Sequence, residues 1–471
     1  MPTLFLNFVG MKKVLFALSF IFAFKVGLFS QTIRIKISQP TQNTIQLFDH
    51  YGERTRLVDS AFINTNAEYV FSIKSNWKPG LYTLKLGKDL KAQFYGGEEA
   101  ELDLIISGKE NIRLKTALVA PIDSLEVLES QENQVYYQYI KRDKFISNQL
   151  GVLNELPNYF PEKDPFFAPV QKRYIALQKE YRSEVDALLL KNSSTLASRY
   201  IKTLRYPFMP FNLPLQDRLS YMKAHWFDEV NFADTALIQT NLLTKKAWGY
   251  IQLYRDQSLN KTQQEPLFAA AADTVIAKCL MNETMAIFMR NQLVKLFEML
   301  GMENAVNHLA ERYASIGSCT DHEGDALKKR LEGSKKLAVG NVAPEIIGTT
   351  VDGKFFDAST IKADKTLLVF WASWCPHCKQ EMPELKKVYE AQKSGTFEVV
   401  AVSIDTNSNE LKTYLKEKQL PWTTLYDGKS WFGALPVAYH LYATPVFYVL
   451  DKNRKIVGKG GGLEEVLEFL H

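Results

Sequence analysis

Two cysteines separated by two residues are the strongest chemical signal in this chain of 471 residues. They are Cys375 and Cys378, within the segment Trp-Ala-Ser-Trp-Cys-Pro-His-Cys at 371–378. An apolar run precedes them and an amphipathic pattern follows, so we expect both thiols at the start of a helix. Unpaired backbone N–H groups and the helix dipole favour the thiolate of Cys375 there. Because such a pair can open and close a disulfide, we interpret it as a redox-active dithiol.

Two neighbouring residues support this interpretation. Pro376 suits the first helical turn, because the N–H that proline lacks would be unpaired there. His377 lies between the cysteines and adds positive charge near the first thiol when it is protonated. A zinc site would need two more ligands, and the remaining cysteines, Cys279 and Cys319, form no second pair of this spacing. We therefore expect neither a metal nor an organic cofactor.

The elements around the dithiol alternate between strand and helix. Apolar runs predict strands at 366–370, 398–404 and 446–450, and helical periodicity predicts helices at 375–393 and 409–418. Asp352-Gly353 predicts a hairpin turn between two short strands. This alternation indicates an α/β domain with parallel strands, which we place at residues 337–471.

Two other patterns divide the rest of the chain. Residues 31–118 alternate apolar and polar side chains between glycine-rich turns, which predicts an antiparallel β-sandwich of about six or seven strands. Its predicted strands are 33–37, 44–48, 69–73, 81–86, 93–95 and 101–106. Residues 119–336 carry apolar side chains three and four apart, which predicts an all-α domain. Its predicted helices are 124–150, 165–191, 194–204, 215–227, 234–254, 266–280, 283–300 and 303–316.

The first thirty residues predict an export signal. Lys12 and Lys13 precede an apolar run at 14–24, which is too short to span about 30 Å of hydrocarbon comfortably as a helix. We expect residues 1–30 to be a cleaved signal peptide, with an uncleaved membrane anchor as the alternative. Both place the rest of the chain outside the cytoplasm, and we expect a periplasmic protein.

Composition narrows the class of protein. Hydrophobic residues make up 46% of the chain and charged residues 23%, near globular averages, which excludes a largely disordered or fibrous chain. The formal net charge is +5, but three lysines of the N-terminal segment, Lys12, Lys13 and Lys25, contribute to it. The remaining chain is nearly neutral, so nothing favours a nucleic-acid partner.

The C-terminal motifs together resemble the TlpA/ResA-like branch of the thioredoxin superfamily, which consists of extracytoplasmic thiol–disulfide oxidoreductases. The resemblance covers residues 337–471 and rests on Gly340-x-x-Ala343-Pro344, Phe370 to Cys378, Glu381-x-Pro383, Val399–Asp405 and Thr444-Pro445. The order of a β-rich region, helices and this domain also resembles multidomain periplasmic members of the family. A thiol peroxidase is the nearest rival, but its usual Thr or Ser three residues before the active cysteine is replaced here by Ala372.

The resemblance implies roles for the motifs. Cys375 attacks a substrate disulfide, and Cys378 resolves the mixed disulfide. Thr444-Pro445 corresponds to a loop with a cis-proline that faces the dithiol, where the backbone of Thr444 pairs with the substrate. The other residues that we assign to substrate binding are Trp374, Pro376 and His377.

Proton transfer needs a further group. Cytoplasmic thioredoxins carry a buried Asp at the position of Val369, so that acceptor is absent here. Glu381 is the expected substitute, because it lies three residues after Cys378 and therefore on the same helical face. The alternative is that Glu381 is a solvated surface carboxylate.

We therefore expect an enzyme that reduces or exchanges disulfides in protein or peptide substrates and depends on a redox partner that the sequence does not identify. A DsbA-like oxidant is one alternative, favoured by the Pro376-His377 dipeptide. A binding or assembly protein with an accessory thioredoxin domain is another, favoured by the size of the two N-terminal regions. Contact with a membrane is expected only through an uncleaved N-terminal anchor.

The remaining cysteines, Cys279 and Cys319, flank two predicted helices that run away and return. A structural disulfide between them is one interpretation, because an oxidising compartment would let it form. Two free thiols, packed as small apolar side chains, are the other.

Overall fold

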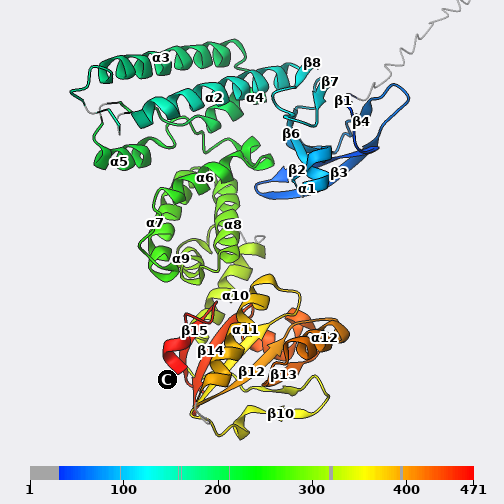
Figure 1. Cartoon of the computed structure of the whole chain (residues 1–471), viewed down its shortest axis with the longest axis vertical. Helices are drawn as coiled ribbons and strands as arrows, with labels where there is room; N and C mark the ends of the chain where they lie inside the picture. Colours follow the sequence, from blue (N-terminus) through cyan, green and yellow to red (C-terminus); the bar gives the residue numbers. More distant parts are fainter. Residues whose placement is uncertain are drawn as a thin grey trace, which may run out of the picture.

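Figure 1 shows the computed structural model, in which the N-terminal sheets lie beside the first helices of the middle region at one end of the long axis and the C-terminal region lies at the other end. The structure describes residues 31–95, 97–156, 159–160, 162–211, 213–317, 322–392 and 396–470. The predicted signal peptide at 1–30 and Cys319 lie outside these residues. None of the helices in the described part combines the length and the hydrophobicity that a membrane span requires.

The N-terminal region contains two four-stranded sheets, with strand orders β4-β1-β7-β8 and β3-β2-β5-β6. Their strands are β1 (Thr32–Ser38), β2 (Thr44–Tyr51), β3 (Arg54–Phe62), β4 (Tyr69–Ser72), β5 (Gly80–Gly87), β6 (Ala100–Ile106), β7 (Ile112–Ala117) and β8 (Glu126–Glu129). Ile33, Ile35 and Ile37 are buried while the residues between them are exposed, as the alternation in β1 predicts.

The pairing in this region corrects the all-antiparallel prediction at one place. β1 runs parallel to β7, with Ile33 opposite Ile112, and antiparallel to β4. A parallel pair needs a long crossover, and here strands β2 to β6 fill it; β2, β3, β5 and β6 form the whole of the other sheet.

Residues 93–95, predicted as a strand, belong instead to helix α1 (Leu90–Tyr95). Asp89 explains the difference. Its Oδ1 accepts the N–H of Ala92 at 2.7 Å, and its carbonyl accepts the N–H of Gln93 at 3.0 Å. This local capping starts a helix where the alternation of side chains alone indicated a strand.

The middle region is helical, as predicted. Its helices are α2 (Gln131–Glu155), α3 (Phe167–Lys191), α4 (Leu196–Leu204), α5 (Leu215–His225), α6 (Leu242–Gln252), α7 (Lys261–Cys279), α8 (Glu283–Met299), α9 (Glu303–Tyr313) and α10 (His322–Lys336). The side chains of Ser130, Thr195 and Asn282 cap three of these helices by accepting backbone N–H groups of the first turn. The predicted helix 124–150 is therefore wrong at its start, because β8 precedes Ser130. The predicted helix 234–254 is divided into a short 3₁₀ helix, η2 (Thr235–Gln239), and α6.

The C-terminal region is an α/β domain around a five-stranded sheet of order β13-β12-β11-β14-β15. β11 lies at its centre, parallel to β12 and antiparallel to β14. The strands of the sheet are β11 (Lys365–Trp371), β12 (Phe397–Ser403), β13 (Thr423–Tyr426), β14 (Val446–Asp451) and β15 (Ile456–Gly460). The helices are α11 (Pro376–Ala391), α12 (Ser408–Lys418) and α13 (Ala434–Ala438). The predicted hairpin precedes them as β9 (Ile347–Thr349) and β10 (Phe355–Asp357).

Buried apolar side chains form two large clusters. One joins both N-terminal sheets to the middle helices, from Ile33 to Leu327. The other begins at Leu337 and fills the C-terminal domain. Ion pairs join the two parts, with Lys459 Nζ 2.8 Å from Glu303 Oε1 and Lys261 Nζ 2.7 Å from Glu465 Oε1.

Candidate active site

The dithiol lies where the central strand β11 ends and α11 begins. Cys375 is the N-cap of α11, and its Sγ accepts the backbone N–H of Cys378 at 3.4 Å. Pro376 is the first helical residue, a position where its missing N–H leaves no hydrogen bond unmade. The strand is buried throughout its second half, so the first cysteine emerges at the edge of the core.

The two thiols differ in exposure. Cys375 is 6% exposed, while Cys378 is fully buried one turn inside the helix. Burial, followed by the hydrogen bond to Cys375, raises the pKa of Cys378 to about 12. Both thiols are free in this structure. Cys378 is therefore held as a protonated thiol behind the more accessible Cys375.

A second loop from far along the chain faces the first cysteine. The peptide bond between Thr444 and Pro445 is cis, and the Sγ of Cys375 lies 3.5 Å from the carbonyl oxygen of Thr444. The two loops meet because β11 and β14 are neighbours, with Phe370 opposite Val446. The structure thus brings together the dithiol and the Thr-Pro loop.

Exposed side chains surround this meeting point. Trp374 is half exposed, and Pro376 and His377 are exposed on the first turn of α11. Thr444 is partly buried, and Pro445 is buried beneath it. The three exposed residues that the sequence assigned to substrate binding therefore lie on the accessible side of the dithiol.

A buried carboxylate that the sequence analysis did not assign a role holds the segment before Cys375. Asp405 is 1% exposed, and its oxygens accept the N–H of Ser373 at 3.0 Å and the hydroxyl of Ser373 at 2.6 Å. The hydroxyl of Ser403 donates to the same carboxylate at 2.7 Å. The signal available in the sequence was an acidic residue placed directly after a largely apolar strand, where a polar side chain is either exposed or hydrogen-bonded.

Glu381 has a different partner from the expected one. It lies one turn beyond Cys378 on α11, and its Oε2 accepts the backbone N–H of Leu463 at 3.0 Å. Leu463 belongs to the segment after β15 that also carries Glu465, the partner of Lys261. Among the described residues no hydrogen bond joins Glu381 to either thiol. The carboxylate is therefore neither freely solvated nor in direct contact with the dithiol.

The other described cysteine, Cys279, is fully buried at the end of α7 with a free thiol, and burial raises its pKa to about 12. Cys319 lies outside the described residues, so the structure does not test a disulfide between the two. Within the described part of the chain, no three His, Cys, Asp or Glu side chains converge as a metal site would require.

Comparison with known proteins finds similar proteins for the C-terminal part of the chain. Residues 339–459 match the model of the AhpC/TSA family. The chain is 27% identical over 136 residues to the thiol-disulfide oxidoreductase ResA of Bacillus thuringiensis subsp. konkukian, an alignment that covers 28% of this chain and 77% of the relative. It is 32% identical over 98 residues to the sporulation thiol-disulfide oxidoreductase A of Bacillus subtilis, covering 20% of this chain and 58% of the relative.

Solved structures of similar proteins include the thioredoxin domain of a thiol-disulfide oxidoreductase from Bacteroides vulgatus. It is 28% identical, with a TM-score of 0.27, and the match covers 28% of this chain and 99% of that one. A thioredoxin-like protein from Bacteroides caccae is 22% identical, with a TM-score of 0.41, and the match covers 57% of this chain and 98% of that one.

The C-terminal part of the chain is thus a thiol–disulfide oxidoreductase domain of the thioredoxin superfamily. Its similar proteins include ResA-like thiol-disulfide oxidoreductases, as the motifs around Cys375 and Cys378 predict.

Proposed function

We propose that the chain is a periplasmic enzyme that reduces or exchanges disulfides in protein substrates through its Cys-Pro-His-Cys dithiol. The observation that carries the proposal is the asymmetry of the dithiol. Cys375 is 6% exposed beside the carbonyl of Thr444, whereas Cys378 is fully buried with a raised pKa. An accessible nucleophile and a shielded resolving thiol are what a two-step exchange needs.

The exchange proceeds in two balanced steps. The thiolate of Cys375 attacks one sulfur of a substrate disulfide, which forms a mixed disulfide and releases the first substrate thiolate. Cys378 then loses its proton and attacks the Sγ of Cys375, which closes the Cys375–Cys378 disulfide and releases the second substrate thiolate. Two electrons pass from the dithiol to the substrate, so a separate thiol donor must reduce the enzyme again.

The surrounding residues position the substrate. An extended segment pairs with the backbone of Thr444 in the cis-proline loop, while Trp374, Pro376 and His377 contact it from the start of α11. Glu381 accepts or returns the proton of Cys378; its carboxylate lies one turn further along α11, where it also accepts the N–H of Leu463. No metal or organic cofactor takes part.

We also propose a division of the chain into a signal peptide and three domains. Residues 1–30 are a signal peptide, residues 31–118 a β-sandwich domain, residues 119–336 a helical domain and residues 337–471 the thioredoxin-like domain. Strand β8 follows the boundary at residue 118, but it pairs with β7 in the N-terminal sheet. The apolar side chains shared by the sheets and the helices support a single N-terminal body that carries the redox domain.

Trapping tests the proposal. Cys378→Ser should accumulate mixed disulfides between Cys375 and its protein substrates, because the resolving thiol is missing. Cys375→Ser/Cys378→Ser is the matched control and should capture none of them. Partners held equally by the double variant would instead identify a binding or assembly protein.

A DsbA-like oxidant is the second candidate, favoured by Pro376-His377 on the exposed first turn of α11. The reduction potential distinguishes the two directions. A value near −270 mV, about that of thioredoxin, supports reduction, and a value near −120 mV, about that of DsbA, supports oxidation.

A further inference from the structure

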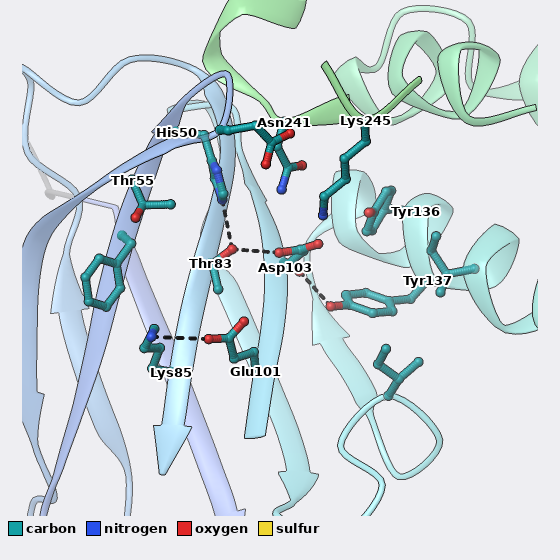
Figure 2. A pocket seen from close by; sticks show the side chains of 14 residues that line it. His50, Thr55, Thr83, Lys85, Glu101, Asp103, Tyr136, Tyr137, Asn241 and Lys245 are labelled. Carbon is teal, nitrogen blue, oxygen red and sulfur yellow. Dashed lines mark hydrogen bonds and ion pairs between the residues drawn. The ribbon is translucent and has the colours of Figure 1, made fainter. Parts of the chain in front are cut away.

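A pocket of about 430 Å³ lies far from the dithiol, where the second N-terminal sheet meets the middle helices (Figure 2). Strands β2, β5 and β6 supply its floor, α2 supplies Tyr136 and Tyr137, and the start of α6 supplies Asn241 and Lys245. Its volume lies in the range of small-molecule sites in proteins.

The strand residues that form the floor of the pocket are polar, although they lie between the sheet and the helices, where apolar side chains are usual. Thr83 pairs with Asp103, and Lys85 pairs with Glu101, across β5 and β6. The alternate residues of the same strands, such as Leu84, are fully buried in the apolar core. The strands therefore present one core face and one row of hydrogen-bonding side chains toward the helices.

A hydrogen-bonded chain across this floor fixes the tautomer of His50. The hydroxyl of Thr83 donates to Asp103 Oδ1 at 2.8 Å, and His50 Nε2 lies 2.8 Å from the same hydroxyl oxygen. Because that hydroxyl has only one proton, His50 Nε2 must be the donor. Burial is the main cause that lowers the pKa of His50, and it outweighs the charge of Asp103 and the backbone of Gly52, which act in the opposite direction. Its Nδ1 is consequently a hydrogen-bond acceptor.

Two buried acceptors at the pocket are left without a donor from the described residues. They are Nδ1 of His50, which is 4% exposed, and Oδ1 of Asn241, which is 8% exposed. Figure 2 shows both side chains above the row formed by Thr83 and Asp103. A buried acceptor without a partner is unfavourable, so a bound group that offers N–H donors would be stabilised between them.

The two lysines of the pocket differ in whether they already form an ion pair. Lys85 Nζ lies 3.4 Å from the carboxylate of Glu101, so these two charges largely compensate each other. Lys245 extends from α6 into the pocket above Asp103, and the structure gives it no ion pair among the described residues (Figure 2). The ammonium group of Lys245 is therefore available to an anionic group of a ligand.

We propose that this pocket binds a small amino carboxylate, either a free amino acid or a short peptide. The ligand ammonium donates to His50 Nδ1 and Asn241 Oδ1 near the carboxylate of Asp103. The ligand carboxylate pairs with Lys245. Tyr136 and the neighbouring apolar side chains of α2 contact the rest of the molecule. The site lies outside the redox domain, and the proposal does not depend on the chemistry of the dithiol.

Calorimetric titration of the full chain with the standard free amino acids and with their glycyl dipeptides tests this inference. Comparison of the free amino acids with the dipeptides shows whether the pocket binds a free amino acid or a short peptide. N-acetylated and C-amidated forms of the best ligand should each bind about tenfold more weakly or worse, because each removes one charge-assisted contact. Lys245→Met should weaken binding by a similar factor.

Lys202→Met is the matched control, because it removes another exposed helical lysine away from the pocket. It should leave binding unchanged, and both variants should retain the disulfide-reducing activity of the parent. Equal binding by the Lys245 and Lys202 variants would overturn the site. Unchanged binding of the N-acetylated and C-amidated forms, or binding of no probe at all, would overturn the ligand class.

Discussion

At the scale of single residues, burial separates the two thiols of the dithiol. They are three positions apart, yet Cys375, the N-cap of α11, keeps 6% of its surface exposed, whereas Cys378 is fully buried. Cys279 provides an internal reference, because it is a buried thiol with no part in the site and its pKa is also about 12. The three described cysteines can therefore be compared in one experiment.

Alkylation of the reduced protein at mildly acidic pH should label Cys375 first. Its sulfur is the accessible one, while Cys378 and Cys279 stay protonated until the pH approaches their raised pKa values. Peptide mass spectrometry over time measures the order. Labelling of Cys378 ahead of Cys375 would contradict the assignment of the nucleophile, and early labelling of Cys279 would indicate that the protein had unfolded.

The hydrogen bond between Glu381 and Leu463 allows two roles of one side chain to be separated. Glu381→Gln keeps an acceptor for the N–H of Leu463 but removes the charge, so it should slow disulfide reduction and alter its pH profile at nearly constant stability. Glu381→Ala removes the hydrogen bond as well and should also cost about 1 kcal/mol of unfolding free energy. Stopped-flow kinetics and denaturant titrations measure both effects. Unchanged kinetics in both variants would leave Glu381 a purely structural role.

At the scale of elements, the sequence predicts those segments best in which one periodicity is uninterrupted. β11, β12 and β14 are dominated by apolar residues, and all three lie within about two residues of their predicted bounds. β3 was missed because most of its residues are exposed and give no alternation. β7 does alternate, with Ile112, Leu114 and Thr116 buried, so its signal was present and unused.

In the candidate site, the sequence likewise identified the residues that belong to local motifs and missed those whose contacts depend on packing. Cys375, Cys378 and Thr444 carry motifs of fixed spacing, and the structure brings them together. Asp405 and Leu463 were not recognised, because their contacts depend on how β12 and the C-terminal segment pack rather than on any local pattern.

Asp405 should be important for the loop before Cys375. Asp405→Asn places an amide N–H₂ where serine hydroxyls and a backbone N–H now donate, which should cost about 1–3 kcal/mol and slow the reaction of Cys375. Asp451→Asn is the comparison, since Asp451 accepts two backbone N–H groups in a turn nearer the surface. Thermal denaturation and alkylation rates measure the two effects. An equal response of the two variants would argue against a special role for Asp405.

Helix α10 packs tightly against the redox domain at a glycine. A Cβ built on Gly333 would overlap the side chain of His440, so Gly333→Ala should destabilise the protein by about 1–3 kcal/mol. Gly151 provides the control in α2, where a Cβ meets open space, and Gly151→Ala should stabilise by about 0.5–1 kcal/mol. Opposite shifts in Tm would verify this contact, whereas stabilisation by both substitutions would show that α10 does not pack as described.

At the scale of the whole molecule, two apolar clusters are joined mainly by polar contacts. Lys459 and Glu465 reach the middle helices from the C-terminal domain, and Arg330 of α10 lies over the ring of Tyr442. Partly exposed ion pairs of this kind contribute about 0–1 kcal/mol each. The two clusters should consequently unfold as separate cooperative units.

Differential scanning calorimetry should therefore resolve two transitions. Leu243→Ala, in the N-terminal cluster, and Leu367→Ala, in the C-terminal cluster, each remove a fully buried side chain at a cost of about 2–5 kcal/mol. Each substitution should lower the temperature of one transition and leave the other in place. A single transition lowered by both would mean that the two clusters unfold together.

The parallel pairing of β1 with β7 determines when the N-terminal region can fold during synthesis. β1 lies between β4 and β7, so its second edge stays open until Ile112–Ala117 has been made. Bringing such distant segments together carries a loop-closure cost before any contact is gained. The isoleucine-rich first strand is therefore an exposed sheet edge in the nascent chain, open to chaperones or to a second nascent chain until the crossover is complete.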